Sequence, residues 1–376
     1  MIKKMVGLIC LIVLVISTAA CGNTNSTKSQ SSKEGKDALT FYTTLYPLTF
    51  FAEEIGGDHV EVNSILPPGA NAHNYEPTTD QMVKIAQSDA FIYVGAGMEH
   101  YAEKISEAVK SEDVKIVEAS NGIDLINSDH DHNHEHEGGE AHDHDHEGEE
   151  AHDHDHEGEE AHEHKHEGEE AHEHKHEGEE AHEHDHEGEE AHDHNHDGHS
   201  HGEKDPHVWL DPIRSIKLAE NIKDTLVELS PDHKDEFNQN FEKLKGELEE
   251  LDQEFATTLK EMPEKKIIVT HAAYGYWANS YGIKQVAVSG LSPDNEPSQK
   301  ELKKIIETSE KYHLKYVFFE QNVTPKVAEV VRKEIGAEAL RIHNVSVLTD
   351  EDIKNGEDYF SLMEKNLETL VKALSS

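Results

Sequence analysis

Residues 232–262 have the sequence DHKDEFNQNFEKLKGELEELDQEFATTLKEM, which decides the fold that we expect for this chain. The apolar side chains recur every three or four residues, which is the spacing of one amphipathic helix with a narrow apolar seam. Such a helix would be about 45 Å long, at about 1.5 Å of rise per residue. A seam of this kind can pair two chains in a coiled coil. We expect it to pack within one chain, because segments of alternating strand and helix character lie on both sides of it.

Strand-like and helix-like segments alternate along the rest of the chain. Upstream, we expect strands at 39–44, 60–66, 90–95 and 114–119, and helices at 46–55, 79–88, 98–110 and 213–229. Downstream, we expect strands at 265–271, 283–290, 316–320 and 338–343, and helices at 274–281, 298–313, 325–335 and 359–374. This alternation predicts parallel sheets covered by helices. We therefore expect an α/β protein of two (β/α) lobes joined by one long rigid helix, with an N-terminal lobe at 39–230, a linking helix at 231–262 and a C-terminal lobe at 263–376.

A histidine-rich tract, residues 129–204, interrupts the N-terminal lobe. It repeats the unit AHxHxHEGEE, and five copies in frame fill residues 141–190. Twenty-four of the 32 histidines in the chain lie in this tract. We expect the tract to be disordered, because it has almost no apolar side chains to bury. Neutral imidazoles beside carboxylates favour borderline metal ions such as Zn²⁺, Cu²⁺ or Ni²⁺, so the tract indicates metal binding without defining a single site.

The chain is strongly acidic, with a formal net charge of −45, of which the tract contributes −28. Nucleic acid is not an expected partner, because its phosphates need lysine and arginine to neutralise them. An acidic surface instead raises the local concentration of cations.

The N-terminus is typical of a secretory leader, with Lys3 and Lys4, an apolar run from Val6 to Ile16, and small residues before Cys21. The apolar run is too short to span a membrane comfortably. The position of Cys21 resembles a bacterial lipoprotein signal. That resemblance implies a signal peptide at 1–20, a lipid on Cys21 that anchors the protein to the outer face of the cell membrane, and a flexible tether at 21–38. The alternative is ordinary cleavage beside an unmodified Cys21.

Three of the eight histidines outside the tract stand apart, because each follows a predicted strand or a turn with proline or glycine. His73 ends the loop after the strand at 60–66, His207 lies between two prolines, and His271 ends the strand at 265–271. In open α/β sheets, ligands bind beyond the carboxyl ends of the strands, which is where His73 and His271 lie. Three imidazoles and one oxygen ligand suit Zn²⁺. The remaining histidines on helices or their edges are expected to be surface residues: His59, His100, His233 and His313.

Four motifs surround these histidines: PPGANAHNYEP at 67–77, DPHVWLDP at 205–212, VTHAAYGYW at 269–277 and SGLSPDNEPS at 289–298. Together they resemble the zinc-binding lipoproteins of bacterial ABC importers, the ZnuA/AdcA-like group. The resemblance covers nearly everything from Leu39 onward except the tract. It implies that the metal lies between the two lobes, with His73, His207 and His271 as ligands. Related manganese and iron binders have a glutamate at the place of His271, so the resemblance favours zinc, and imidazole suits zinc better than manganese.

The fourth ligand departs from the pattern of the family. Some relatives supply a glutamate from a segment like IHNVSVLT, where this chain has Ser346, and others supply an acidic residue beside the first histidine, where this chain has Asn71 and Ala72. Water, Glu320 or an aspartate near Asp350 could complete the coordination instead.

These features predict an extracytoplasmic, monomeric protein that captures Zn²⁺ and delivers it to an ABC permease and its ATPase. Two alternatives stay open: a manganese-binding homologue, and a surface metal buffer or adhesin that acts through the tract.

Catalysis is not expected. The zinc-protease motif HExxH occurs at 162–166, 172–176 and 182–186, but it arises from the alternation of His and Glu in a polar tract. The protease chemistry needs that motif on a helix packed in a cleft.

Overall fold

The structure is a computed structural model that describes residues 38–128, 204–321 and 324–375. The expected leader, the tether with Cys21, and the histidine tract up to residue 203 lie outside these residues. The described part contains two four-stranded sheets in which every pair of strands is parallel, and this confirms the α/β fold expected from the sequence. Across the described ranges, no helix combines the length and the apolar character that a membrane crossing needs.

The first sheet has the strand order β2-β1-β3-β4. Its strands are β1 (Leu39–Thr43), β2 (Val60–Ser64), β3 (Ala90–Tyr93) and β4 (Lys115–Glu118). The helices between them are α1 (Tyr46–Gly56), α2 (Thr79–Ala86) and α3 (His100–Ala108). α2 begins at a capping box, in which the side chains of Thr78 and Gln81 each bind the backbone N–H of the other residue.

The second sheet repeats this arrangement with the order β6-β5-β7-β8. Its strands are β5 (Lys266–Val269), β6 (Lys284–Ala287), β7 (Tyr316–Glu320) and β8 (Glu338–Ile342). Its helices are α6 (Gly275–Tyr281), α7 (Gln299–Tyr312), α8 (Lys326–Glu334), α9 (Asp350–Asn355) and α10 (Tyr359–Leu374). In each sheet the chain steps from one central strand to a neighbour on one side and then returns to the other side. This creates a topological switch point between β1 and β3 and another between β5 and β7.

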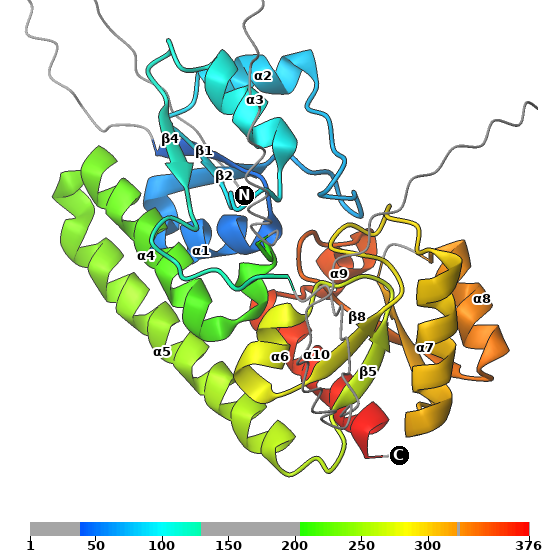
Figure 1. The fold of residues 1–376 in the computed structure, drawn as a ribbon. Coiled ribbons are helices and arrows are strands. Elements are labelled where there is room, and N and C mark those ends of the chain that lie inside the picture. Colours follow the sequence, from blue (N-terminus) through cyan, green and yellow to red (C-terminus); the bar gives the residue numbers. More distant parts are fainter. Residues whose placement is uncertain (1–37, 129–203, 322–323, 376) are drawn as a thin grey trace, which may run out of the picture.

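Two long helices, α4 (Pro212–Leu229) and α5 (Lys234–Lys260), lie side by side, and α5 runs along both lobes (Figure 1). The seven apolar residues of the predicted seam in α5 are all buried: Phe237, Phe241, Leu244, Leu248, Leu251, Phe255 and Leu259. They belong to one hydrophobic cluster that also contains residues of both sheets. The seam therefore packs within the chain, as expected, and α5 packs against both lobes.

Candidate metal site

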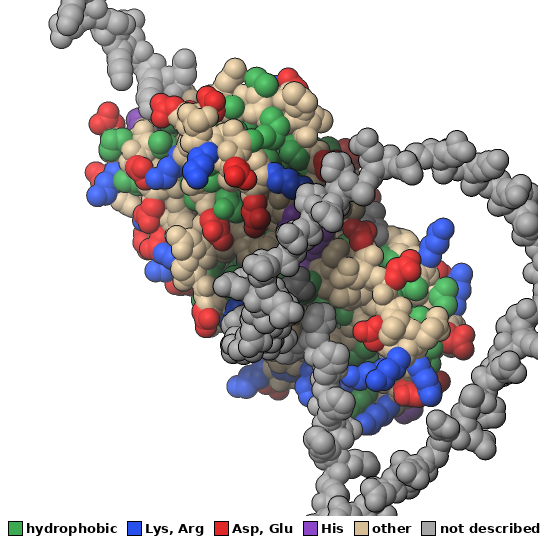
Figure 2. Space-filling view, turned by 45° about the horizontal axis from the view of Figure 1, so that its top comes forward, with side chains coloured by type: hydrophobic (Ala, Val, Ile, Leu, Met, Phe, Trp, Pro, Cys, Tyr) green, Lys and Arg blue, Asp and Glu red, His purple; other side chains and the backbone are tan. Residues whose placement is uncertain are grey.

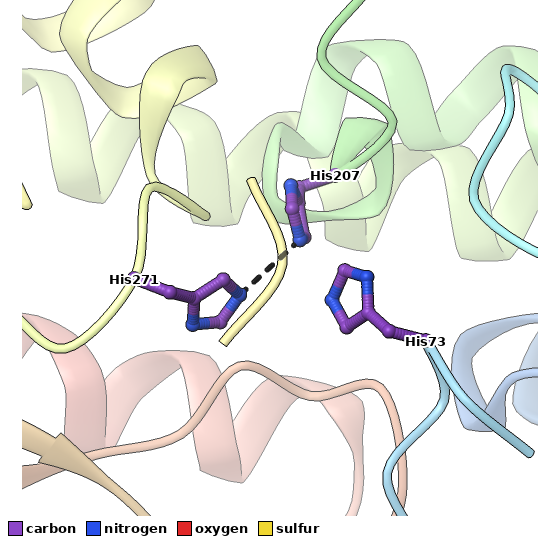
Figure 3. Close-up of side chains that lie close together, drawn as sticks. All are labelled: His73, His207 and His271. Atoms are coloured by element: carbon purple, nitrogen blue, oxygen red, sulfur yellow. Dashed lines mark hydrogen bonds between the residues drawn. The ribbon is translucent and has the colours of Figure 1, made fainter. Parts of the chain in front are cut away.

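Three loops bring His73, His207 and His271 together (Figure 3). Each side chain offers one ligand nitrogen, and these nitrogens all lie within 4.8 Å of one another. Nε2 of His207 and Nε2 of His271 are 3.4 Å apart. Two nitrogens bound to one tetrahedral zinc ion at about 2.0–2.1 Å would be separated by roughly 3.3 Å. The cluster therefore has nearly the spacing that a single zinc ion requires.

His271 lies at the switch point of the second sheet. It follows β5, which pairs with β7 in the register Val269 to Phe318, and this register carries His271 and Glu320 to the same edge. The carboxylate of Glu320 contacts Nδ1 of His271, and both side chains are buried. A proton on Nδ1, beside the carboxylate, would leave the lone pair on Nε2, which faces His207.

Glu320 is held by several groups at once. One carboxylate oxygen accepts a hydrogen bond from the Thr270 hydroxyl at 3.2 Å, and the other accepts one from the Asn344 amide at 2.7 Å. Burial alone would raise the pKa of Glu320, but the adjacent His271 outweighs that effect and holds this pKa below its ordinary value. Glu320 is therefore an ionised orienting partner of His271, and each of its carboxylate oxygens accepts a hydrogen bond.

His207 is oriented in the same way by Asp205. Oδ1 of Asp205 accepts hydrogen bonds from Nδ1 of His207 at 2.9 Å and from the His207 backbone N–H at 3.0 Å. Asp205 fits only because residue 275 is glycine, since a Cβ there would lie 2.2 Å from Oδ2 of Asp205. The pair is almost completely buried. The sequence motif contained Asp205, but sequence reasoning assigned it no role.

The segment that carries His207 is fastened to the second lobe by three aromatic side chains. The Tyr276 hydroxyl donates to the Asp205 carbonyl at 2.7 Å, and Nε1 of Trp277 donates to the Leu210 carbonyl at 2.7 Å. Nε1 of Trp209 donates to the carbonyl of Asn344 at 2.8 Å. These hydrogen bonds fix the position and the orientation of the backbone at His207 before any ligand binds.

His73 comes from the loop between β2 and α2 in the first lobe, and this loop also binds the second lobe. The amides of Asn71 and Asn74 donate to Oδ2 of Asp294 at 3.3 and 3.0 Å. The Gly69 N–H donates to the Leu348 carbonyl at 2.9 Å. His73 is half-buried, whereas His207 and His271 are buried. In Figure 2, histidine side chains are visible between the two lobes. His73 therefore lies on the open side of the cluster.

The imidazole of His73 is neutral at physiological pH. Burial is the main cause, and the neighbouring His207 and His271 add to it, so that the pKa of His73 is lowered to about 2. A neutral imidazole is the form that binds a metal ion, so the apo site is poised to accept one without first releasing a proton from His73.

Two further residues were expected near the fourth coordination position. Ser346 lines a small opening beside His73, together with Asn71 and Pro293, and its hydroxyl donates to Oδ1 of Asn344 at 2.8 Å. Asp350 is exposed in the first turn of α9. Neither residue belongs to the group of side chains whose ligand atoms converge at this site.

The histidines expected at the surface divide into two pairs. His100 and His313 are exposed, as predicted. His59 and His233 are instead half-buried, and their rings stack with centroids 3.6 Å apart. This second pair is partly covered, because the fold brings together two turns that are far apart in the sequence.

Residues 42–373 match the family model described as ZnuA, zinc-uptake complex component A, periplasmic. Zinc-binding lipoprotein AdcA of Streptococcus pneumoniae is 33% identical over 367 residues, which cover 98% of this chain and 60% of AdcA. The chain thus spans about three-fifths of the length of that relative. The high-affinity zinc uptake system protein ZnuA of Bacillus subtilis is 31% identical over 374 residues, which cover 100% of this chain and 99% of ZnuA.

Solved structures agree with this likeness. The Zn(II)-bound ZnuA-like domain of Streptococcus pneumoniae AdcA has a TM-score of 0.63 at 29% identity, and the match covers 90% of this chain and 100% of that domain. The laminin-binding protein Lmb of Streptococcus agalactiae has a TM-score of 0.65 at 24% identity, with coverage of 90% and 99%, which establishes likeness of fold alone. The family match over most of the chain and the nearly full-length likeness to ZnuA lead to one conclusion: this chain belongs to the family of the zinc-uptake complex component A proteins.

Proposed function

We propose that this protein is the extracytoplasmic zinc-binding component of an ABC importer, and that His73, His207 and His271 are its protein ligands to Zn²⁺. One observation carries the proposal. Three imidazoles from three separate loops converge with nearly the spacing of zinc ligands, and buried carboxylates orient two of them. Loops fastened in advance need little ordering when the ion binds, which favours tight binding.

Zinc is the proposed cargo rather than manganese. Three imidazoles suit zinc, whereas manganese prefers carboxylate, carbonyl and water oxygens. Asp205 and Glu320 contact the Nδ1 atoms of His207 and His271, on the side of each ring that faces away from the cluster, and so orient the rings. The names of AdcA and ZnuA, as zinc-binding and zinc-uptake proteins, agree with this choice.

Water is the proposed fourth ligand. The Ser346 hydroxyl is a poor zinc ligand compared with a carboxylate, and it donates its proton to Asn344. A small opening lies beside His73, on the side of the cluster where a water ligand would bind. An exchangeable water suits an ion that must later leave the protein. We propose no catalysis, because Glu320 and Asp205 are committed to orienting imidazoles and are not free to act as a general base on that water.

Delivery would require a membrane permease and its ATPase as partners. The proposed lipid on Cys21 would hold the protein at the membrane, on the side from which zinc is taken up. We propose a monomer, because the apolar seam of α5 is buried within its own chain and so is not available to pair with a second copy.

A zinc titration against a competing chelator tests this function, on the full-length protein and on a variant that lacks residues 129–203. Asn127 and Lys204 form a bridge at the base of the tract, so the removal joins ends that are already adjacent. We expect one tight phase in both proteins, and the numerous weak phases of the tract only in the full-length protein.

His73→Ala should abolish the tight phase in both proteins. His100→Ala, at an exposed histidine of α3, should leave that phase unchanged. A tight phase that survives His73→Ala but vanishes with the tract would favour a surface metal buffer. Tighter binding of Mn²⁺ than of Zn²⁺ would favour the manganese alternative.

A further inference from the structure

A second cluster of metal-ligating side chains lies outside the three loops. It contains His59 from the turn η1 (Gly57–His59), His233 from the turn η3 (Pro231–His233) and Glu236 from the first turn of α5. One ligand atom from each of these residues lies within 4.8 Å of the others. Among the residues that the structure describes, this cluster and the three-histidine cluster are the two groups with that property.

The second cluster is held together by direct contacts. The rings of His59 and His233 stack at an interplanar angle of 22°, and Nε2 of His59 is 3.0 Å from Oε2 of Glu236. Both rings lie against the buried ring of Phe237, with centroid distances of 5.9 and 6.1 Å. The amide of Asn240 donates to the Ile55 carbonyl at 3.0 Å, which ties α5 to the end of α1 close to this cluster. The scaffold therefore positions the three side chains before a ligand arrives.

The chemistry of the cluster suits a borderline divalent ion. Zinc accepts histidine nitrogens and glutamate oxygens, and tetrahedral coordination would leave one position for water. The exposed neighbours Asp58, Asp232 and Asp235 add negative charge, while Lys234 opposes it. Stacked rings direct their nitrogens side by side, so the imidazoles must tilt for both to reach one ion. Half-buried rings can tilt, but the adjustment costs free energy and makes this site weaker than the three-histidine site.

We propose that His59, His233 and Glu236 form a second zinc site, which cross-links the turn after α1 in the first lobe to the beginning of α5. This site is separate from the proposed cargo site. In Figure 1 the turn between α4 and α5 lies at the outer edge of the first lobe, whereas the three-histidine loops meet between the lobes. Zinc that binds the folded cluster and not its opened form lowers the equilibrium population of the opened form by the factor 1 + [Zn²⁺]/Kd, and hydrogen exchange through that form slows in proportion.

Hydrogen exchange measured by mass spectrometry on the full-length protein, with and without Zn²⁺, tests this site. At a free zinc concentration ten times the Kd of the site, amides in peptides that cover 57–60 and 231–240 should exchange about tenfold more slowly. His59→Ala should abolish that protection. Glu236→Gln should do the same, and it changes only an exposed side chain, so loss of the fold does not explain its effect. His313→Ala, at an exposed histidine that ends α7, should keep the protection.

The same experiment on His73→Ala separates the two sites. Zinc-dependent protection of 57–60 and 231–240 should persist in that variant, because the ligands of the second site do not include His73. Protection that disappears with His73→Ala would mean that zinc at the three-histidine site acts on these peptides from a distance, and the proposal would be wrong. Protection that is unchanged in both His59→Ala and Glu236→Gln would reject it as well, and would leave the cluster as an ordinary ion pair beside a stacked ring.

Discussion

At the scale of single residues, the site depends on carboxylates that we do not expect to touch the metal. Asp205 and Glu320 each contact the Nδ1 atom of a histidine, which leaves the lone pair on Nε2 directed toward the cluster. The histidines could be identified from the sequence because they follow strand ends or lie between prolines. The carboxylates could not be assigned their roles, because the contact of His271 with Glu320 arises from the pairing of β5 with β7.

Asp205→Ala should weaken zinc binding by about 10–100-fold without abolishing it. The three histidines would remain, but His207 would lose the acceptor that fixes its tautomer and its ring direction. A chelator-competition titration measures the change, with Asp113→Ala, at an exposed carboxylate after α3, as the control. Equal affinities for the two variants would mean that Asp205 does not position His207.

At the scale of elements, apolar periodicity located the strands and the long helix but not their ends. The strand expected at 265–271 ends at Val269, although the Thr270 N–H still donates to the Phe318 carbonyl, and His271 beyond it belongs to the three-histidine cluster. α9, at Asp350–Asn355, was not predicted, since six residues are too few for a periodic signal. Its capping box of Thr349 and Asp352 is the local sign of this helix in the sequence.

Leu248→Ala should destabilise the protein by about 2–5 kcal/mol, the usual cost of a cavity in a packed core. Leu248 lies in the buried seam of α5, which joins the two lobes in one cluster. Urea unfolding measures the loss, with Glu250→Ala on the exposed face of the same helix as the control. If Leu248→Ala lowered the free energy of unfolding no more than the control does, the claim that the buried face of α5 packs against both lobes would be contradicted.

At the scale of the whole molecule, the proposed cargo site exists only where the two lobes meet. The His73 loop belongs to the first lobe by sequence, yet Asp294 and Leu348 of the second lobe bind it. The sequence indicated a site at strand ends, and the resemblance implied a site between lobes. Neither could indicate which side of the cluster is open, because that depends on how deeply each histidine is buried in the folded chain.

Zinc at the three-histidine site should survive acidification that removes zinc from the tract. A proton competes with zinc for a nitrogen only as the pH approaches the pKa of that nitrogen in the metal-free protein. Burial is the main reason that the pKa of His73 is lowered to about 2. A solvated histidine titrates near about 6.5, so the tract should lose its zinc first as the pH falls from about 7 to about 5.

Elemental analysis after dialysis at each pH measures this order of release. The zinc content of the variant that lacks residues 129–203 reports the tight site, and the difference from the full-length protein reports the tract. If the shortened protein released its tightly bound zinc at a higher pH than the tract did, the burial argument for His73 would be wrong.

The central claim is that zinc binds between the lobes, on His73, His207 and His271. X-ray diffraction at the zinc absorption edge, from crystals of the full-length protein with one equivalent of Zn²⁺, locates the ion directly. We predict an anomalous peak about 2.0–2.1 Å from one nitrogen of each of the three histidines, with water at the fourth position. A peak on other histidines, with the three-histidine site vacant, would contradict the account.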